Sequence, residues 1–597
     1  MSLLDQINGN ADLQKLKIEE LSALAQEIRA RIIEVTKANG GHLASNLGIV
    51  ETTIALHRCF DFSKDKIVFD VGHQCYAHKL LSGRGEVFSS IRTSGGISGF
   101  PDAEESAFDS FSTGHAGTSI SAALGLCQAR DMLGEDYTVV AVVGDGSLSN
   151  GLNLEALNAS NDKPKNFIVI VNDNGMSISK NKNGFYKLIS KSTTKRGYVK
   201  SKRAIKKIFG NSFVTKFLRK IREFVKRVFN RNNYFEKLGF KYVGVLDGNN
   251  LNEMQSIMPR IKNVAKEQAI LLHVKTTKGK GLAVAEQNSE GYHGVGKNHS
   301  TSLSGFAETL GEALNQIIER DSKVVAVTAG MKKGTGLDAV EEKHASNFID
   351  VGIAEEYAVT LAAGMAKGGL KPVVAVYSTF LQRAYDQILH DVCAQNLPVV
   401  FCIDRAGFVG EDGKTHQGLF DLSFLSHIPN LTVLTPVDER DLKYCLDYAL
   451  GLNSPVAIRY PKKGEKVYDG AFDGAKWVKL RDGDFVTLLA VGPRMIKNAL
   501  EVCSRCKGVS VVAVRSVVPL DCELLDSLKG KVVTLEENVL SGGFGQTVTT
   551  YYAQKENKVK VYTLGVDGQF VKHGNVDSQM KQFGLDVCSL EKFVNSL

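Results

Sequence analysis

The strongest constraint on the fold of this chain is a repeated alternation between short apolar runs and stretches of helical periodicity. The apolar runs, in chain order, are KIVFDVG, YTVVAVVGDG, NFIVIVND, KVVAVTAG, PVVAVYS, PVVFCIDRAG, FVTLLAVG, VSVVAVRS and KVVTLEEN. Continuous apolar strands, each followed by a helix, are what a parallel sheet covered on both faces requires. The sequence therefore predicts an α/β fold of three doubly wound domains with mainly parallel sheets.

The runs fall into three groups, which predict domains over residues 1–303, 304–480 and 481–597. A chain of 597 residues has room for about three or four domains of ordinary size. The first domain opens with apolar residues at helical spacing from Ile18 to Ile32, and Gly40-Gly41 ends that pattern.

The sequence carries no recognisable signal for export or membrane insertion. Its N-terminal stretch mixes acidic, basic and amide residues, and no run approaches the roughly 18 apolar residues of a membrane span. Ten cysteines are scattered along the chain. The CxxC pair of Cys503 and Cys506 lies in a helical pattern without a second ligand pair, which favours helix packing over a metal or redox site. We therefore expect a cytoplasmic protein.

Polar residues follow two strands of the first domain at the point where each strand ends. Gly144-Asp145-Gly146 follows one apolar run, and Asn172-Asp173-Asn174 follows the next. In parallel sheets ligands bind outside the carboxyl ends of the strands. Asp145 offers an anionic oxygen and Asn174 a neutral one, so both can reach one hard cation, while the glycines let the backbone approach a phosphate. Taken alone, the first motif is more often an ordinary turn; the pair favours a cation and diphosphate site.

This pair of motifs resembles the metal and diphosphate motif of thiamine-diphosphate enzymes. Further motifs resemble, in order and spacing over essentially the whole chain, the 1-deoxy-D-xylulose-5-phosphate synthase family of the transketolase-like superfamily. They are GGHLASNLG (40–48), DVGHQCYAHKLLSGR (70–84), STGHAGTSIS (112–121), IAEEYAV (353–359), YSTFLQRAYDQILHDV (377–392), DRAGFVGEDGKTHQGLFDLS (404–423) and RYPKKG (459–464).

The resemblance implies an enzyme, a transferase that uses thiamine diphosphate and Mg²⁺. It would condense pyruvate with D-glyceraldehyde 3-phosphate and release 1-deoxy-D-xylulose 5-phosphate and CO₂. That reaction is the first step of non-mevalonate isoprenoid synthesis and also feeds thiamine and pyridoxal synthesis. A transketolase-like ketol transfer is the alternative within the superfamily. The resemblance also implies a homodimer, and leaves open whether the cofactor lies between domains of one chain or between subunits.

The same motifs imply roles for individual residues. Mg²⁺ would be held by Asp145, Asn174 and the backbone carbonyl of Met176. Thiamine diphosphate would be contacted by His73, Gly114, His115, Ala116, Gly146, Ser147 and Asn174, and Glu355 would promote loss of the thiazolium C2 proton. His42 and His416 would exchange protons with the substrates. Substrate contacts would come from His293, Tyr377, Ser378, Arg383, Arg405, Asp412 and Arg459. Of these, Arg405 and Arg459 would bind the phosphate of D-glyceraldehyde 3-phosphate.

The sequence departs from the common family pattern at two places. Glu356-Tyr357 stands where Gln-His is frequent, and Leu282 stands where an aromatic residue often contacts the cofactor. Outside the motifs, a glutamate at a helix start is more often a favourable first-turn charge, so the role of Glu355 rests on its motif.

One basic segment accounts for the positive charge of the chain. Residues 180–231 hold eighteen Lys and Arg against one acid, Glu223, a local net charge of +17, whereas the whole chain carries +8. Such a segment indicates either a mobile cover that attracts anionic substrates to the active site or attachment to an anionic membrane surface. A protein that only binds anionic surfaces is the alternative class. We expect no nucleic-acid partner and no stable membrane association.

Overall fold

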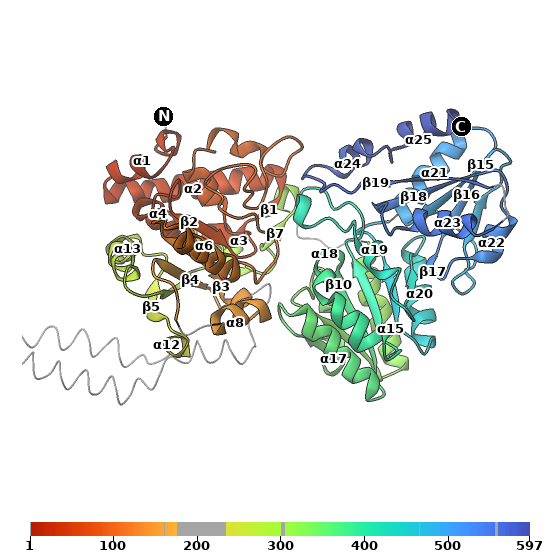
Figure 1. The fold of residues 1–597 in the computed structure, drawn as a ribbon, viewed down its shortest axis with the longest axis horizontal. Coiled ribbons are helices and arrows are strands. Elements are labelled where there is room, and N and C mark those ends of the chain that lie inside the picture. Colours follow the sequence, from red (N-terminus) through yellow and green to blue (C-terminus); the bar gives the residue numbers. More distant parts are fainter. Residues whose placement is uncertain (1, 160–161, 176–233, 300–304, 465, 556–558) are drawn as a thin grey trace, which may run out of the picture. The chain divides into compact units, whose positions relative to one another are not determined.

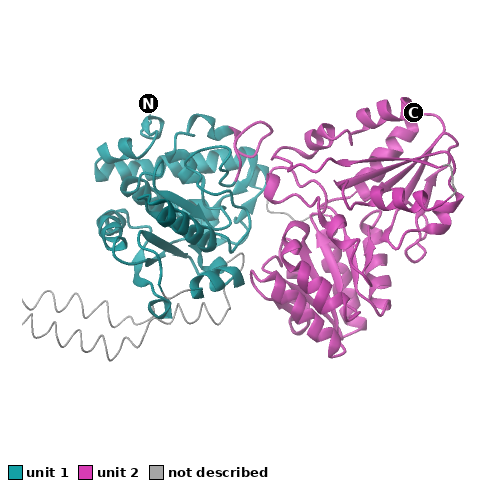
Figure 2. Cartoon of the chain, in the orientation of Figure 1, with its two compact units in different colours: residues 1–89, 100–299 teal, residues 90–99, 300–597 magenta. Residues whose placement is uncertain are grey.

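The structure is a computed structural model that describes the chain except residues 1, 160–161, 176–233, 300–304, 465 and 556–558 (Figure 1). It divides into two compact units, one of residues 1–89 and 100–299 and one of residues 90–99 and 300–597 (Figure 2). Each of the three large sheets in the described part is mainly parallel, which confirms the predicted α/β class. The basic segment 180–231 lies outside the described residues.

The first unit is built on a five-stranded sheet in which every neighbouring pair is parallel. Its strands, in spatial order, are β2 (Lys66–Phe69), β3 (Val139–Gly144), β4 (Phe167–Asp173), β6 (Ile270–Lys275) and β5 (Lys241–Asp247). A separate antiparallel pair joins β1 (Gly41–His42) to β7 (Gly294–Val295). The helices are α1 (Asn10–Lys15), α2 (Ile18–Asn39), α3 (Ala44–Gly48), α4 (Val50–Cys59), α5 (Tyr76–Leu81), α6 (Ser119–Leu133), α7 (Asp145–Leu148), α8 (Gly151–Asn158), α12 (Tyr234–Lys237), α13 (Leu251–Ala265) and α14 (Ala283–Gln287).

Helix α6 lies across strands β2, β3 and β4 and packs against α8, with a buried cluster between the helices and the sheet (Figure 1). Helix α2 matches the periodicity predicted from Ile18 onward and ends at Gly40. Gly40 has φ +74°, and a Cβ there would lie 2.7 Å from the carbonyl oxygen of Val295. The turn into β1 therefore requires glycine.

The second unit contains a seven-stranded sheet with helices on both faces. In spatial order its strands are β17 (Ser516–Val518), β12 (Thr432–Leu434), β13 (Val456–Arg459), β11 (Val400–Asp404), β10 (Lys371–Tyr377), β8 (Val324–Thr328) and β9 (Phe348–Asp350). Val325 and Val327 of β8 pack with α17 (Glu355–Lys367), whereas Val324 and Ala326 pack with α15 (Phe306–Arg320) and α20 (Glu439–Gly451). Alternate residues of a strand thus face opposite layers, as a doubly wound sheet requires.

The antiparallel edge strand of this sheet, β17, comes from beyond residue 480. The third predicted domain therefore contributes a strand to the sheet of the second. Buried Arg515, just before β17, donates Nε to Asp441 Oδ2 of α20 at 2.9 Å and Nη2 to Asp441 Oδ1 at 2.6 Å. The boundary at residue 480 stays a prediction, because the compact unit includes both sheets.

The remaining sheet has five strands: β14 (Val478–Arg481), β16 (Val509–Val514), β15 (Val486–Val491), β18 (Lys531–Val539) and β19 (Lys560–Val566). Other helices of the second unit are α16 (Asp338–Lys343), α18 (Ser378–Leu381), α19 (Asp421–Leu425), α21 (Pro493–Arg505), α22 (Cys522–Ser527), α23 (Phe544–Ala553), α24 (Val576–Gln582) and α25 (Val587–Asn595). Cys503 lies in α21 with Sγ 3.2 Å from Val509 O, and Cys506 Sγ lies 3.7 Å from Asn595 Oδ1. Cys506 is also part of a buried apolar cluster against which Cys503 packs, which is the packing role the sequence favoured.

Within the described residues, no helix is both long enough and apolar enough to cross a membrane.

Candidate cofactor and substrate site

The predicted metal ligands lie at the carboxyl edge of the first unit's sheet. Asp145 directly follows β3, and Asn174 directly follows β4. These strands are neighbours, with Gly144 opposite Asn172. Asp145 is buried and Asn174 half-buried, so both are placed as the sequence predicted, whereas Met176 lies outside the described residues. No group of three or more His, Cys, Asp or Glu side chains that could hold a metal occurs in the described part. The predicted site does not require such a group, because its ligands are one carboxylate, one amide and one backbone carbonyl.

The backbone at Gly144 fits the approach of a ligand. Gly144 has φ −73°, which any residue adopts. A Cβ built on it would meet no described atom within 4 Å. The fold of the described residues therefore does not require glycine at this position. A phosphate bound close to the backbone would require it, because a side chain would block that approach. The residues present fit a diphosphate and its metal.

Three predicted histidines, all half-buried, form one cluster in the first unit. The ring centroids of His42 and His73 are 6.0 Å apart, those of His42 and His293 5.7 Å, and those of His73 and His293 5.2 Å. The β1–β7 pairing produces this arrangement by placing His42 opposite Gly294. Burial, with smaller effects from the neighbouring cations, holds the pKa of His73 and of His293 well below the ordinary value. Both rings are therefore neutral at pH 7, able to donate at one nitrogen and accept at the other.

Lys278 is a site residue that the sequence did not single out. It follows β6 and is buried. Burial lowers its pKa to about 8, although the charges of Asp145 and Glu290 oppose the shift. Its charge also lowers the pKa of His73 and His293. A buried cation close to the metal ligand and the histidines suits a diphosphate. The turn KTTKGKG resembles a solvated basic loop, so no sequence signal distinguishes Lys278 from its neighbours.

Buried amides link the turns that carry these residues. Asn46 donates Nδ2 to the carbonyl oxygens of His42 at 2.6 Å and His73 at 2.9 Å. Asn172 donates Nδ2 to Gln74 Oε1 at 2.9 Å and accepts the hydroxyl of Thr276 at 2.6 Å. Each amide joins separate turns at the edge where the predicted residues lie.

The segment of Gly114, His115 and Ala116 precedes α6, with Gly114 and Ala116 buried and His115 half-buried. Gly146 and Ser147 lie in α7, also buried.

Glu355 is the first residue of α17 in the second unit and is only 4% exposed. Burial raises the pKa of its carboxyl to about 7, although the charge of Arg383 opposes the shift. In the described part of the chain its Oε2 has no hydrogen-bond partner. The group can therefore hold or release a proton near neutral pH. Tyr357, on the same helix, is exposed.

The predicted substrate residues of the second unit gather at the ends of β10 and β11. Tyr377 is opposite Asp404 in the sheet, and Arg405 follows directly. The Arg405 guanidinium lies 4.5 Å from the Tyr377 ring centroid and donates to the Tyr377 hydroxyl at 3.3 Å and to Asp404 Oδ2 at 2.8 Å. Ser378, at the start of α18, is buried.

Asp412 accepts a hydrogen bond from Arg92 within the second unit. His416 lies close by, with its ring centroid 5.5 Å from that of Phe380. Burial lowers the pKa of His416, with Arg92 acting in the same direction and Asp412 against it.

Arg459 occupies a different environment from Arg405. It ends β13, is buried, and donates Nε to Asp421 Oδ1 at 2.8 Å and Nη2 to Glu537 O at 2.7 Å. These contacts favour a structural role, and its assignment to the substrate stays a prediction. Lys462, three residues on, has an exposed side chain, yet desolvation of its ammonium and the charge of Arg405 lower its pKa. The sequence does not indicate a role for Lys462, because an exposed lysine in a turn carries no signal of its own.

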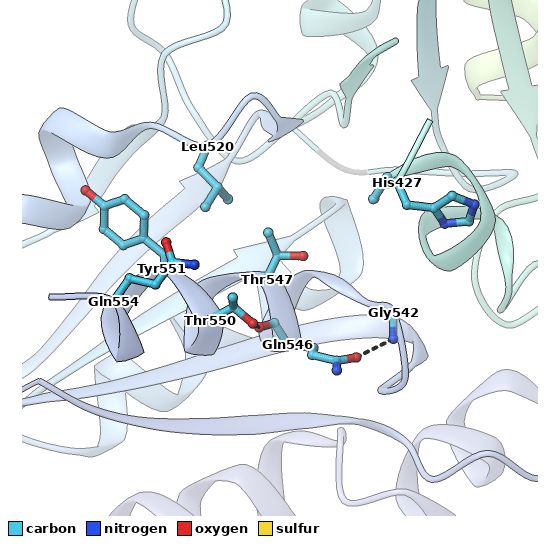
Figure 3. A pocket seen from close by; sticks show the side chains of 9 residues that line it. His427, Leu520, Gly542, Gln546, Thr547, Thr550, Tyr551 and Gln554 are labelled. Carbon is cyan, nitrogen blue, oxygen red and sulfur yellow. Dashed lines mark hydrogen bonds between the residues drawn. The ribbon is translucent and has the colours of Figure 1, made fainter. Parts of the chain in front are cut away.

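A cavity of about 470 Å³ lies elsewhere in the second unit (Figure 3). Thr547, Thr550 and Gln546 of α23 line it together with His427. None of the predicted site residues lines this cavity.

Family models match three consecutive parts of the chain. Residues 4–276 match the family model described as 1-deoxy-D-xylulose-5-phosphate synthase, residues 305–465 the pyrimidine-binding domain of transketolase, and residues 475–590 the transketolase C-terminal domain. These three matches place the chain in the class of thiamine-diphosphate-dependent enzymes of the transketolase type.

Two relatives named 1-deoxy-D-xylulose-5-phosphate synthase match over almost their whole length. The protein from Clostridium tetani is 45% identical, covering 100% of both chains, and that from Carboxydothermus hydrogenoformans is 46% identical, covering 98% of this chain and 97% of its own. The chain therefore belongs to the 1-deoxy-D-xylulose-5-phosphate synthase family. Membership supports the enzymatic function of that family and implies thiamine diphosphate and Mg²⁺ as cofactors.

A solved transketolase from Campylobacter jejuni aligns over 98% of this chain and 100% of its own at 18% identity, with a TM-score of 0.41. This similarity is too weak to assign the fold, which is assigned from the strand order of the three sheets.

Proposed function

We propose that this chain condenses pyruvate with D-glyceraldehyde 3-phosphate to 1-deoxy-D-xylulose 5-phosphate and CO₂, the entry step of non-mevalonate isoprenoid synthesis. The observation that carries the proposal is the placement of Asp145, Asn174 and Lys278 at one sheet edge in a chain of this family. Thiamine diphosphate, when bound, supplies the chemistry that stabilises the carbanion left by decarboxylation.

The residues of the first unit bind and orient the cofactor. Asp145 and Asn174 would hold Mg²⁺, with the carbonyl of Met176 as the third ligand that the family resemblance implies, because carboxylate, amide and carbonyl oxygens are the ligands this hard cation prefers. Lys278 supplies positive charge to the diphosphate. The turn 114–116 and Gly146 bring backbone close to it. The neutral imidazole of His73 would contact the cofactor, and His42 and the neutral imidazole of His293 would exchange hydrogen bonds and protons with the substrate oxygens.

In the second unit, Glu355 would be the partner of the cofactor's aminopyrimidine ring, because its pKa of about 7 lets the carboxyl hold or release a proton at neutral pH. Arg405 and Lys462 bind the phosphate of the aldehyde substrate, since both cations lie beside the polar end of β10 and β11. The other polar residues around this substrate are Tyr377, Ser378, Arg383, Asp412 and His416. That the enzyme is a cytoplasmic homodimer stays a prediction resting on family resemblance.

The test is to incubate the purified full-length protein with thiamine diphosphate, Mg²⁺, pyruvate and D-glyceraldehyde 3-phosphate. We expect equal amounts of CO₂ and a five-carbon ketose phosphate. Replacing pyruvate with a ketose phosphate donor tests the transketolase-like alternative. Ketol transfer without CO₂ would favour that alternative, and no turnover of either pair would favour a protein that only binds anionic surfaces.

A further inference from the structure

Asp70 lies where three turns of the first unit meet. It directly follows β2 at the carboxyl edge of the sheet and is fully buried. Its Oδ1 accepts the backbone N–H of Gly117 at 2.9 Å, and its Oδ2 accepts that of Ser119 at 3.0 Å. The carboxylate therefore fixes the start of α6, immediately after the proposed cofactor turn 114–116.

The same carboxylate holds the second proposed cofactor turn. The hydroxyl of Ser147 donates to Asp70 Oδ1. Asn153 donates Nδ2 to Asp70 Oδ2 at 3.4 Å and to the carbonyl oxygen of Ser147 at 2.8 Å. Because the Ser147 hydroxyl donates its proton to Asp70, it cannot donate the same proton to a diphosphate.

The donors around Asp70 are all uncharged. Among the described residues, no Lys, Arg or His forms an ion pair with it. A buried carboxylate needs hydrogen bonds in place of water, and here the turns 114–117 and 144–147 supply them. Neither turn can shift without leaving that carboxylate short of a donor.

We propose that Asp70 is a positioning residue that locks the turns 114–117 and 144–147 together before the cofactor binds. The inference rests on the proposed function, because it is the cofactor that both turns would contact. Replacing a residue that only orients the groups in direct contact with a ligand typically weakens the affinity by roughly 10–100-fold. The same order of effect is expected here, since preorganised turns need no ordering on binding.

Asp65 provides a matched control at the other end of β2. It is also buried and accepts the backbone N–H of Thr138, just before β3, at 2.8 Å. It therefore performs a comparable task for the fold at the amino edge of the sheet, away from the proposed cofactor turns. A purely structural role for Asp70 predicts the same behaviour for both aspartates.

The experiment measures two quantities on the full-length protein without substrate: the Kd of thiamine diphosphate at saturating Mg²⁺ by titration calorimetry, and the unfolding midpoint of the cofactor-free protein. We expect Asp70→Asn and Asp65→Asn to lower the midpoint. We expect only Asp70→Asn to raise the Kd, by roughly 10–100-fold. Ser147→Ala removes one donor alone, so it should raise the Kd by less.

Equal Kd values for wild type and Asp70→Asn would overturn the inference and leave the proposed function intact. A wild-type protein that fails to bind thiamine diphosphate would overturn both. If Asp70→Asn does not fold, Ser147→Ala decides: a raised Kd supports the inference, and a wild-type Kd overturns it.

Discussion

Arg459 donates its Nε to the buried Oδ1 of Asp421 at 2.8 Å. Removing one partner of a buried ion pair leaves a charge without compensation, which costs about 3–5 kcal/mol. We therefore expect Arg459→Ala to lower the free energy of unfolding by about that amount, measured by urea denaturation. The apparent affinities for both substrates should fall together, or not at all. A stable variant with a raised KM for D-glyceraldehyde 3-phosphate alone would instead assign Arg459 to the substrate.

Lys462 and Lys463 offer a direct comparison for the phosphate contact. Both are exposed in the same turn, but the charge of Arg405 acts on Lys462. Lys462→Met should raise the KM for D-glyceraldehyde 3-phosphate by roughly tenfold or more, the usual worth of a hydrogen bond to a charged group. The KM for pyruvate should not change, because pyruvate carries no phosphate. Lys463→Met serves as the control, and equal effects of the two variants would contradict the assignment.

The sequence was sufficient for the fold class because nine strands form continuous apolar runs that are almost entirely buried. Each of the nine apolar runs corresponds to a strand, such as β3 and β10. Strand β5 was not predicted, because it lies at the sheet edge and its residues are exposed or half-buried. Strand β9 has only three residues. Neither produces the continuous apolar signal on which the prediction depended.

The site was predictable where motifs carry it and not where tertiary packing does. Asp145 and Asn174 follow strands that pair in the sheet, and chain order alone predicted their proximity. By contrast, the family resemblance assigned His42 and His293 to the substrates, but no strand pattern in the sequence predicted the β1–β7 pairing that brings them together. The burial of Lys278 and the ion pair of Arg459 are equally consequences of packing between distant segments. The functional roles of all these residues stay predictions.

Asp145 should control the response of the protein to Mg²⁺. Asp145→Ala removes the anionic ligand. The Kd of thiamine diphosphate should therefore rise by more than the roughly 10–100-fold expected for residues that only orient the metal ligands. Chelation of Mg²⁺ from the wild type should produce a similar loss, and chelation should have little further effect on the variant. Titration calorimetry with and without a chelator checks both. A variant that still gains affinity from Mg²⁺ as the wild type does would contradict the assignment.

Lys278 and Lys280 lie in one turn but face different partners. Lys280 donates to Asn249 O at 3.1 Å and lies 3.3 Å from Glu51, whereas the charge of Lys278 acts on His73, His293 and Asp145. Lys278→Met should weaken thiamine diphosphate binding by roughly 10–100-fold, as expected for losing a hydrogen bond to a charged group. Lys280→Met should leave the Kd close to that of the wild type. Equal affinities of the two variants for the cofactor would remove Lys278 from the site.

Glu355 should make the cofactor-free protein less stable as the pH rises. Its pKa is about 7 in the folded chain against an ordinary 4.5, so between these values the folded state binds more protons than the unfolded state. The contribution of this carboxyl to stability is therefore fully present below about pH 4.5, falls as the pH rises to about 7, and stays low above it. Glu355→Gln removes the buried charge and should raise the free energy of unfolding at pH 8 by up to about 3 kcal/mol. Urea denaturation at pH 5 and pH 8 should show this gain mainly at the higher pH.

The same substitution should abolish activity while the cofactor still binds. An amide keeps the size of the side chain but cannot take up or release the proton that the proposed function assigns to this carboxyl. Exchange of the C2 hydrogen of bound thiamine diphosphate for deuterium, followed by NMR, should then slow by orders of magnitude. A gain in stability together with a loss of activity would identify Glu355 as a group whose environment destabilises the folded protein and serves its chemistry. Wild-type exchange in Glu355→Gln would exclude it as the activating residue, whatever the change in stability.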